Sequence, residues 1–158
     1  MTQDEIISFV AAMDGVLTLR PAPGDGSPDV AWGDTFFYYA PDGVVPAAAQ
    51  PFATIVTKNL PGDATSRLDR PDAHRVNIAA GKEEFTRWTG RPPGGREPAT
   101  TAPAADDTVV AHPVYAAAGW LAVVNPGPRT RTATAELLST AHRLARARHE
   151  RRPGPSGG

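Results

Sequence analysis

The chain has 158 residues, a length that suits a single domain with a sizeable buried core. Lysine and arginine total 16 against 17 for aspartate and glutamate, and this balance disfavours a strongly polyanionic partner while leaving room for a local basic face. The chain contains no cysteine, which excludes disulfides, thiolate zinc sites, iron–sulfur clusters and cysteine nucleophiles.

The N-terminal segment predicts a helix in a cytoplasmic protein. Residues 1–5 are polar and acidic where a secretory signal is basic and then apolar, and no run in the chain approaches the roughly 20 apolar residues of a membrane span. Thr2 and Glu5 have the spacing of a capping box, and apolar residues follow at helical spacing until Gly15. We therefore expect a short amphipathic first helix and no membrane partner.

Three β-rich segments follow the first helix. Residues 16–19 alternate as a brief strand, residues 35–39 are mostly aromatic, and residues 52–57 are apolar with several β-branched side chains. Residues 20–28 carry prolines and glycines and predict a loop. Because a short connection separates residues 35–39 from residues 52–57, these two strands are expected to pair antiparallel.

The second half of the chain predicts further strands and helices. They are strands at residues 74–78 and 120–124, a mixed segment at residues 109–115, and helices at residues 81–88 and 132–150. Thr132 is the expected cap of the last helix, whose C-terminal end is basic. The neighbouring Asp106 and Asp107 are expected to solvate the end of a loop.

Two segments are too rich in proline and glycine to join a core. Residues 90–106 predict a disordered insertion, and residues 153–158 predict a disordered tail. Residues 1–152 would then form a single α+β domain. Its antiparallel β-sheet packs on one side against the N-terminal and C-terminal helices, in an order of roughly α-β-β-β-β-α-β-α.

Several blocks of the chain resemble an uncharacterised family of small bacterial proteins without an assigned activity. These blocks are PFATIVTK, LDRPDAHRVNI followed by KEEF, HPVYAAAGW followed by VVNP, and ELLSTAHRLARAR. The layout is also similar to that of the MmcQ/YjbR (CyaY-like) group. The features that match it are a strand that reaches Lys58, the His112-Pro113 turn, a strand beginning at Trp120, and the closing helix. This second resemblance implies a curved antiparallel sheet with helices, and a label of DNA binding.

The loop between residues 57 and 74 is the first candidate site. Its charged residues and those beside it are Lys58, Asp63, Arg67, Asp69, Arg70, Asp72 and Arg75. Lys58, Arg67, Arg70 and Arg75 would converge on an anionic ligand, because arginine forks suit phosphate and carboxylate groups. Asp69 and Asp72 would orient the guanidinium groups. The alternative is an Asp–Arg network centred on Asp69, Arg70 and Asp72 that anchors the loop to the sheet.

His112 and Tyr115 form the second candidate site. An imidazole with its ordinary pKa near neutrality suits a general base or a metal ligand, and His112 would act with Asp69 or Lys58 in a cleft. No second histidine lies at ligand spacing, so the alternative is a histidine that is hydrogen-bonded within a turn. Tyr115 belongs to a set of aromatic residues that would line a pocket or fill the core.

The motifs favour binding over catalysis. The chain has no glycine-rich phosphate loop and no Gly-x-Ser-x-Gly elbow, and it indicates no cofactor and no metal. The leading hypothesis is a non-catalytic binding or interaction module whose partner is a small anionic ligand, bound at the loop, or another protein. The alternatives are a small enzyme using His112, and a DNA-binding protein of the MmcQ/YjbR type whose basic helix end contacts phosphates, although the net charge of −1 disfavours nucleic acid.

Overall fold

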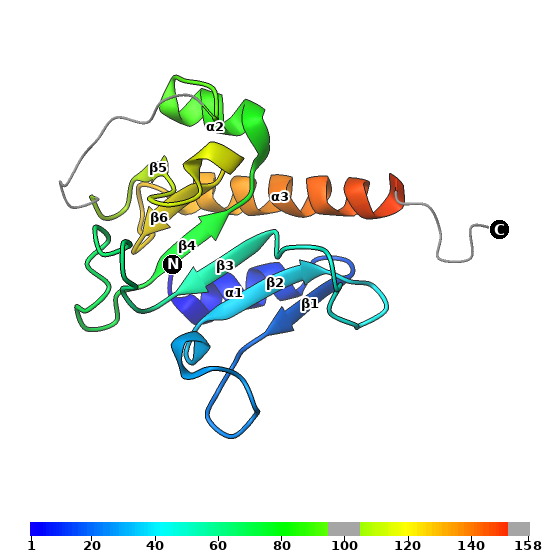
Figure 1. The fold of residues 1–158 in the computed structure, drawn as a ribbon. Coiled ribbons are helices and arrows are strands. Elements are labelled where there is room, and N and C mark those ends of the chain that lie inside the picture. The colour runs from blue at the N-terminus through cyan, green and yellow to red at the C-terminus, as the bar shows by residue number, and fades with distance from the viewer. Residues whose placement is uncertain (95–104, 152–158) are drawn as a thin grey trace.

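The computed structural model describes residues 1–94 and 105–151, which form a six-stranded sheet in the order β1-β2-β3-β4-β6-β5 (Figure 1). The strands are β1 (Val16–Leu19), β2 (Thr35–Tyr39), β3 (Ala53–Val56), β4 (Arg75–Ile78), β5 (Val109–Ala111) and β6 (Leu121–Val124). Every neighbouring pair is antiparallel, including the predicted pair β2 and β3. β5 forms one edge of the sheet and adds one strand to the expected order. It lies in residues 109–115, for which the sequence predicted only a mixed segment.

The helices of the described residues confirm the predicted α+β class. They are α1 (Gln3–Ala11), α2 (Gly81–Thr89) and α3 (Arg131–Arg151), with short 3-10 turns η1 (Asp29–Ala31) and η2 (Ala116–Ala118). The predicted capping box is present, because the Thr2 hydroxyl accepts from the Glu5 N–H at 3.1 Å and the Glu5 carboxylate accepts from the Thr2 N–H at 3.2 Å. Among the described helices, none combines the length and the hydrophobicity that a bilayer crossing requires.

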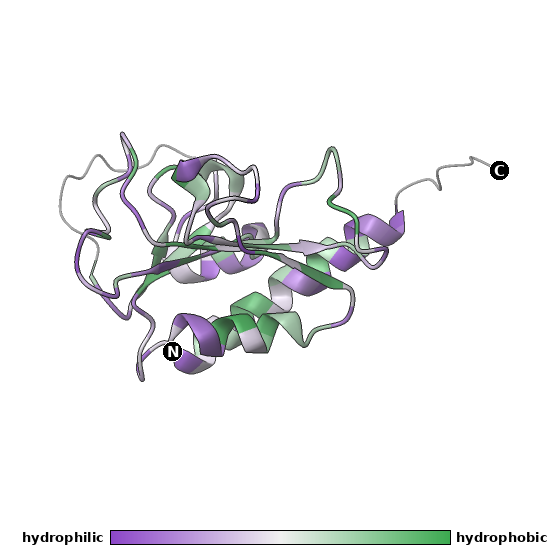
Figure 2. Ribbon diagram, turned by 90° about the horizontal axis from the view of Figure 1, so that it is seen from below, coloured by the Kyte–Doolittle hydropathy of each residue, from purple (hydrophilic) through white to green (hydrophobic). Residues whose placement is uncertain are grey.

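One face of the sheet and the helices enclose the main core. Strand side chains alternate between the two faces, so Ile55 and Val76 stand opposite each other and point the same way. They join a buried cluster with Ile6 of α1 and Leu138 of α3. Phe85 of α2 completes it. Figure 2 views the sheet edge-on and shows α1 and α3 together on this face, as predicted.

The other face of the sheet is covered by the charged loop. Leu68 and Ala73 of the loop pack against Val56 and Val124 in a second, smaller buried cluster. Beside this cluster the strands present polar side chains instead of apolar ones. The loop therefore packs on the sheet through a small apolar contact, and its remaining contacts are polar.

Asp107 holds the N-terminal end of α3. Its carboxylate accepts from the backbone N–H groups of Gly127 at 2.8 Å, Arg129 at 3.0 Å and Thr130 at 2.9 Å, and from the Thr130 hydroxyl at 2.6 Å. A Cβ atom at Gly127 would lie 2.8 Å from the carboxylate, so glycine makes room for this cap. The helix begins at Arg131, so the expected cap at Thr132 is wrong, and so is the expectation that Asp107 only solvates a loop.

The hydrogen bonds to Asp107 predict an acid-dependent stability. The Thr130 hydroxyl and the backbone N–H groups outweigh the opposing effect of burial and lower the pKa of Asp107 from 3.8 to about 2. A carboxylate with a lowered folded pKa stabilises the fold above its unfolded pKa and loses this effect as the pH falls through the folded value. Asp107→Asn should lower the midpoint of thermal unfolding at neutral pH by a few degrees and flatten its fall between about pH 4 and pH 2.

Circular dichroism melts from neutral pH to pH 2 would measure this effect. Asp69→Asn is the matched control, since that exposed carboxylate makes no hydrogen bond with a described residue, and its melts should follow those of the unchanged chain. Identical pH dependence in Asp107→Asn and the unchanged chain would contradict the role of this cap.

Candidate functional site

Lys58 ties the start of the loop to the segment that precedes β2. Its ammonium donates to the backbone carbonyl of Trp32 and lies 3.3 Å from Oδ1 of Asp34. The same carboxylate oxygen accepts from the backbone N–H of Thr57 at 2.9 Å and from the Thr57 hydroxyl at 3.0 Å. The positive charge of Lys58 is thus already matched by a buried carboxylate.

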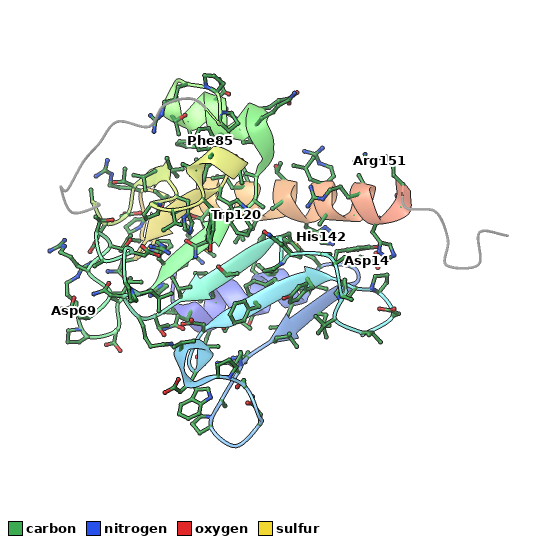
Figure 3. All side chains as sticks on the ribbon, viewed as in Figure 1. Asp14, Asp69, Phe85, Trp120, His142 and Arg151 are labelled. Atoms are coloured by element: carbon green, nitrogen blue, oxygen red, sulfur yellow. The ribbon has the colours of Figure 1, made fainter. Side chains whose placement is uncertain are left out.

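Arg70 is held by Asp106, far from Lys58. Two guanidinium N–H groups of Arg70 donate to the two carboxylate oxygens of Asp106, each at 2.9 Å. These hydrogen bonds raise the pKa of Arg70 and lower the pKa of Asp106. Arg67 and Asp69 are exposed, and Figure 3 shows Asp69 on the outer side of the loop. The expected anchor at Asp69 is wrong, because Asp106 supplies the carboxylate.

Arg75 is the centre of a buried polar network on the loop side of the sheet. It is 2% exposed, and its guanidinium donates to both oxygens of Asp63 at 2.8 and 2.9 Å. It also donates to Ser66 at 3.0 Å and to the side-chain oxygen of Asn77 at 2.7 Å, and Asn77 donates in turn to Thr54 at 2.9 Å. Burial opposes ionisation of Asp63, but the hydrogen bonds and charge of Arg75 outweigh it and lower the pKa of this carboxyl.

His112 lies against this network as a neutral imidazole. Its Nδ1 accepts from the backbone N–H groups of Val114 at 3.0 Å and Tyr115 at 2.9 Å, so the ring proton resides on Nε2. Nε2 faces a guanidinium N–H of Arg75 at 3.5 Å, and two donors at this distance form no hydrogen bond. Burial, followed by the charge of Arg75, lowers the pKa of His112 from 6.5 to about 3.

Three of the predicted site residues, Arg75, His112 and Tyr115, form one group, whereas Arg70 meets Arg67 separately through a hydrogen bond to its carbonyl. Tyr115 is 58% exposed, and its ring centre lies 4.9 Å from that of His112, which packs against Arg75. The predicted partners Lys58 and Asp69 are engaged or exposed elsewhere in the loop. Whether any of these side chains contacts a ligand stays a prediction. Trp120, which belongs to the set of aromatic residues expected to line a pocket or fill the core, completes the aromatic group at 6.3 Å from His112 and 6.5 Å from Tyr115.

A cavity of about 690 Å³ lies at the end of the sheet where β2 ends and β3 begins. Its aromatic lining consists of Tyr38, Tyr39 and Trp120. The β2–β3 connection contributes the small and apolar side chains of Pro46, Ala48, Ala49 and Pro51 and the amide of Gln50. Figure 1 shows the last turns of α3 running on past the ends of β4 and β6, where they form the remaining wall.

Two arginines give that wall its positive charge. Arg148, His149 and Arg151 of α3 line the cavity, and no described residue that lines it is an aspartate or glutamate. The His149 ring stands edge-on to Tyr39 with ring centres 5.2 Å apart and the planes at 70°, which fixes the helix against the end of β2. Two guanidinium groups on one concave surface attract anions.

The sequence shows the aromatic and the basic residues of this cavity, but it does not show that they lie side by side. The aromatic run at residues 35–39 and the basic end of the last helix are visible as separate patterns. They meet because the antiparallel sheet brings the end of β2 to the C-terminal half of α3. Among the described residues, no three histidine, aspartate or glutamate side chains gather in a way that could hold a metal ion.

The chain belongs to a family of unknown function, DUF6194, whose model matches residues 1–154. This confirms the resemblance to an uncharacterised family over nearly the whole chain. Searches of curated proteins and of solved structures return no match. The similarity to the MmcQ/YjbR group therefore gains no support from these comparisons.

The Arg75–Asp63 pair predicts a large loss of stability when one partner is removed. Asp63→Asn leaves a buried guanidinium without its counter-charge, which typically costs about 3–5 kcal/mol. Arg87→Gln is the control, because its pair with Glu84 is exposed and such pairs contribute about 0–1 kcal/mol. Urea denaturation at neutral pH would measure both free energies of unfolding, and equal values for the two variants would show that the buried pair does not hold the loop.

The lowered pKa of His112 predicts a fold that weakens in mild acid. The unfolded imidazole binds a proton below about pH 6.5 and the folded one only near pH 3, so stability should fall by about 1.4 kcal/mol per pH unit between these values. His112→Asn keeps an acceptor near the position of Nδ1 but removes the titration. Urea midpoints from pH 7 to pH 5 should therefore fall less steeply in this variant, and an unchanged slope would rule out a neutral buried imidazole.

Proposed function

We propose that this member of the DUF6194 family is a non-catalytic binding protein whose cavity at the end of the sheet takes a small anionic ligand. The observation that carries the proposal is the lining of the cavity. Arg148 and Arg151 on α3 line the cavity together with the aromatic side chains of Tyr38, Tyr39 and Trp120. An anion bound there would meet positive groups from one helix wall and apolar surface from the opposite wall.

The charged loop is a weaker candidate for the anion. Three of its four predicted anion-binding cations, Lys58, Arg70 and Arg75, each meet a carboxylate of the same chain, and the fourth, Arg67, is exposed. A ligand at Arg75 would have to displace Asp63 from a buried bidentate pair, which is costly in a low-dielectric environment. These contacts support an anchoring role for the loop.

The alternatives have less support. An enzyme based on His112 needs a basic nitrogen, whereas Nδ1 accepts two backbone N–H groups and Nε2 carries the proton. DNA binding through the end of α3 needs an accessible basic surface, whereas Arg146 lies 2.9 Å from Glu150 and 3.7 Å from Asp14.

Removal of the two cavity arginines tests the proposal. In the full chain, titration with inorganic phosphate, acetate and adenosine monophosphate should give saturable shifts of the backbone amides of Gln50 and Ala79 in a two-dimensional NMR spectrum. Arg148→Ala with Arg151→Ala should weaken the tightest of these interactions roughly 10-fold or more, because each guanidinium supplies a charge-assisted hydrogen bond.

Arg143→Ala is the matched control, since this exposed arginine is on the same helix but does not line the cavity. It should bind as the unchanged chain does. The proposal is overturned if none of the three anions gives saturable shifts at the cavity, or if the double variant binds as well as the control. A duplex oligonucleotide that binds while these small anions do not would favour the DNA-binding alternative.

A further inference from the structure

Because the cavity has aromatic residues on one side and arginines of α3 on the other, we infer that the anionic ligand carries a planar aromatic or heteroaromatic ring. This inference rests on the proposed function and specifies its ligand class. Phosphate and carboxylate are both compatible with the cationic wall, so the common chemistry is a flat ring joined to either group.

Trp120 provides a fixed ring surface. It precedes β6, is half-buried, and packs against His112 and Tyr115 with ring centres 6.3 and 6.5 Å apart. Because His112 is held by two backbone hydrogen bonds and lies against Arg75, the indole rests on a rigid neighbour. An aromatic surface that is positioned before binding loses little conformational entropy when a ring stacks on it.

The side chains beside Trp120 are small. Five alanines line the cavity, together with Pro46 and Pro51. These are Ala48, Ala49, Ala79, Ala118 and Ala145. A lining of alanine and proline next to tyrosine and tryptophan leaves a space that is apolar on its walls, and such surroundings favour a flat apolar group over a hydrated one. The Gln50 amide offers one donor and one acceptor for a ring heteroatom.

The positive charge is confined to one side of this space. Arg148 and Arg151 are three residues apart on α3 and therefore share a face of the helix. Figure 3 shows that Arg151 and Trp120 lie well apart, with Trp120 near the middle of the molecule and Arg151 at the end of α3. A simple anion would use only the cationic side, whereas a ring joined to an anionic group would contact both sides.

Matched pairs of ligands test the inference. Adenosine monophosphate differs from ribose 5-phosphate by the base, and benzoate differs from cyclohexanecarboxylate by the flatness of the ring. We expect the aromatic member of at least one pair to bind the full chain about 10-fold more tightly, within the range that stacking on one aromatic side chain supplies. The pair that shows the preference identifies whether phosphate or carboxylate is the natural anionic group.

Two variants assign the preference to the ring surface. Trp120→Leu should reduce the 10-fold preference to about 3-fold or less and leave the binding of ribose 5-phosphate unchanged. Trp88→Leu is the matched control, because this tryptophan is 40% exposed on α2 outside the cavity, and it should keep the full preference. If Trp120→Leu does not fold, Tyr38→Leu provides the same comparison at the aromatic residue that β2 contributes to the cavity.

The outcomes separate this inference from the proposed function. Equal affinities within both pairs, at amides of the cavity, would overturn the ring requirement and leave anion binding standing. A preference that survives both Trp120→Leu and Tyr38→Leu would also overturn it. If no member of either pair gives saturable shifts, both the ring requirement and the anion-binding function fail.

Discussion

The buried ion pair between Arg75 and Asp63 determines how the second face of the sheet is used. A buried guanidinium at the start of a central strand loses its hydration and needs a counter-charge and further acceptors, or the strand could not be buried there. Asp63, Ser66 and Asn77 supply them, and two of these three belong to the loop. The loop must therefore lie over this face, while the helices pack on the other.

A series of side-chain contacts links the ion pair to the cavity. His112 is neutral beside Arg75 because burial and the nearby positive charge both disfavour its protonation. Its two backbone hydrogen bonds fix the turn that carries Tyr115, and the His112 ring supports Trp120. One wall of the cavity is thus held in place by a polar network that has no direct access to the ligand we propose.

The two ends of α3 have different roles. Its N-terminal end is capped and stabilises the fold, and its C-terminal end lines the cavity. Asp107 satisfies three backbone N–H groups at the N-terminal end, where the helix dipole favours a negative charge. The C-terminal end carries Arg148, His149 and Arg151 past the edge of the core to the cavity. Since one rigid helix spans both places, the anchoring of its first turn also positions the cationic wall.

The sequence by itself determined the local structure. The capping box at Thr2, the antiparallel pair of residues 35–39 and 53–56, and the apolar stripe of α3 follow from spacing within a few residues, and each is present. Only the tertiary structure decided which charges pair. Arg70 meets Asp106 across 36 positions and Arg75 meets Asp63 across 12, so the alternation of charges within the loop was no guide to its partners. For the same reason the cavity could not be foreseen. Its aromatic and cationic sides come from β2, the start of β6 and the end of α3, and only the packing of the sheet against that helix brings them together.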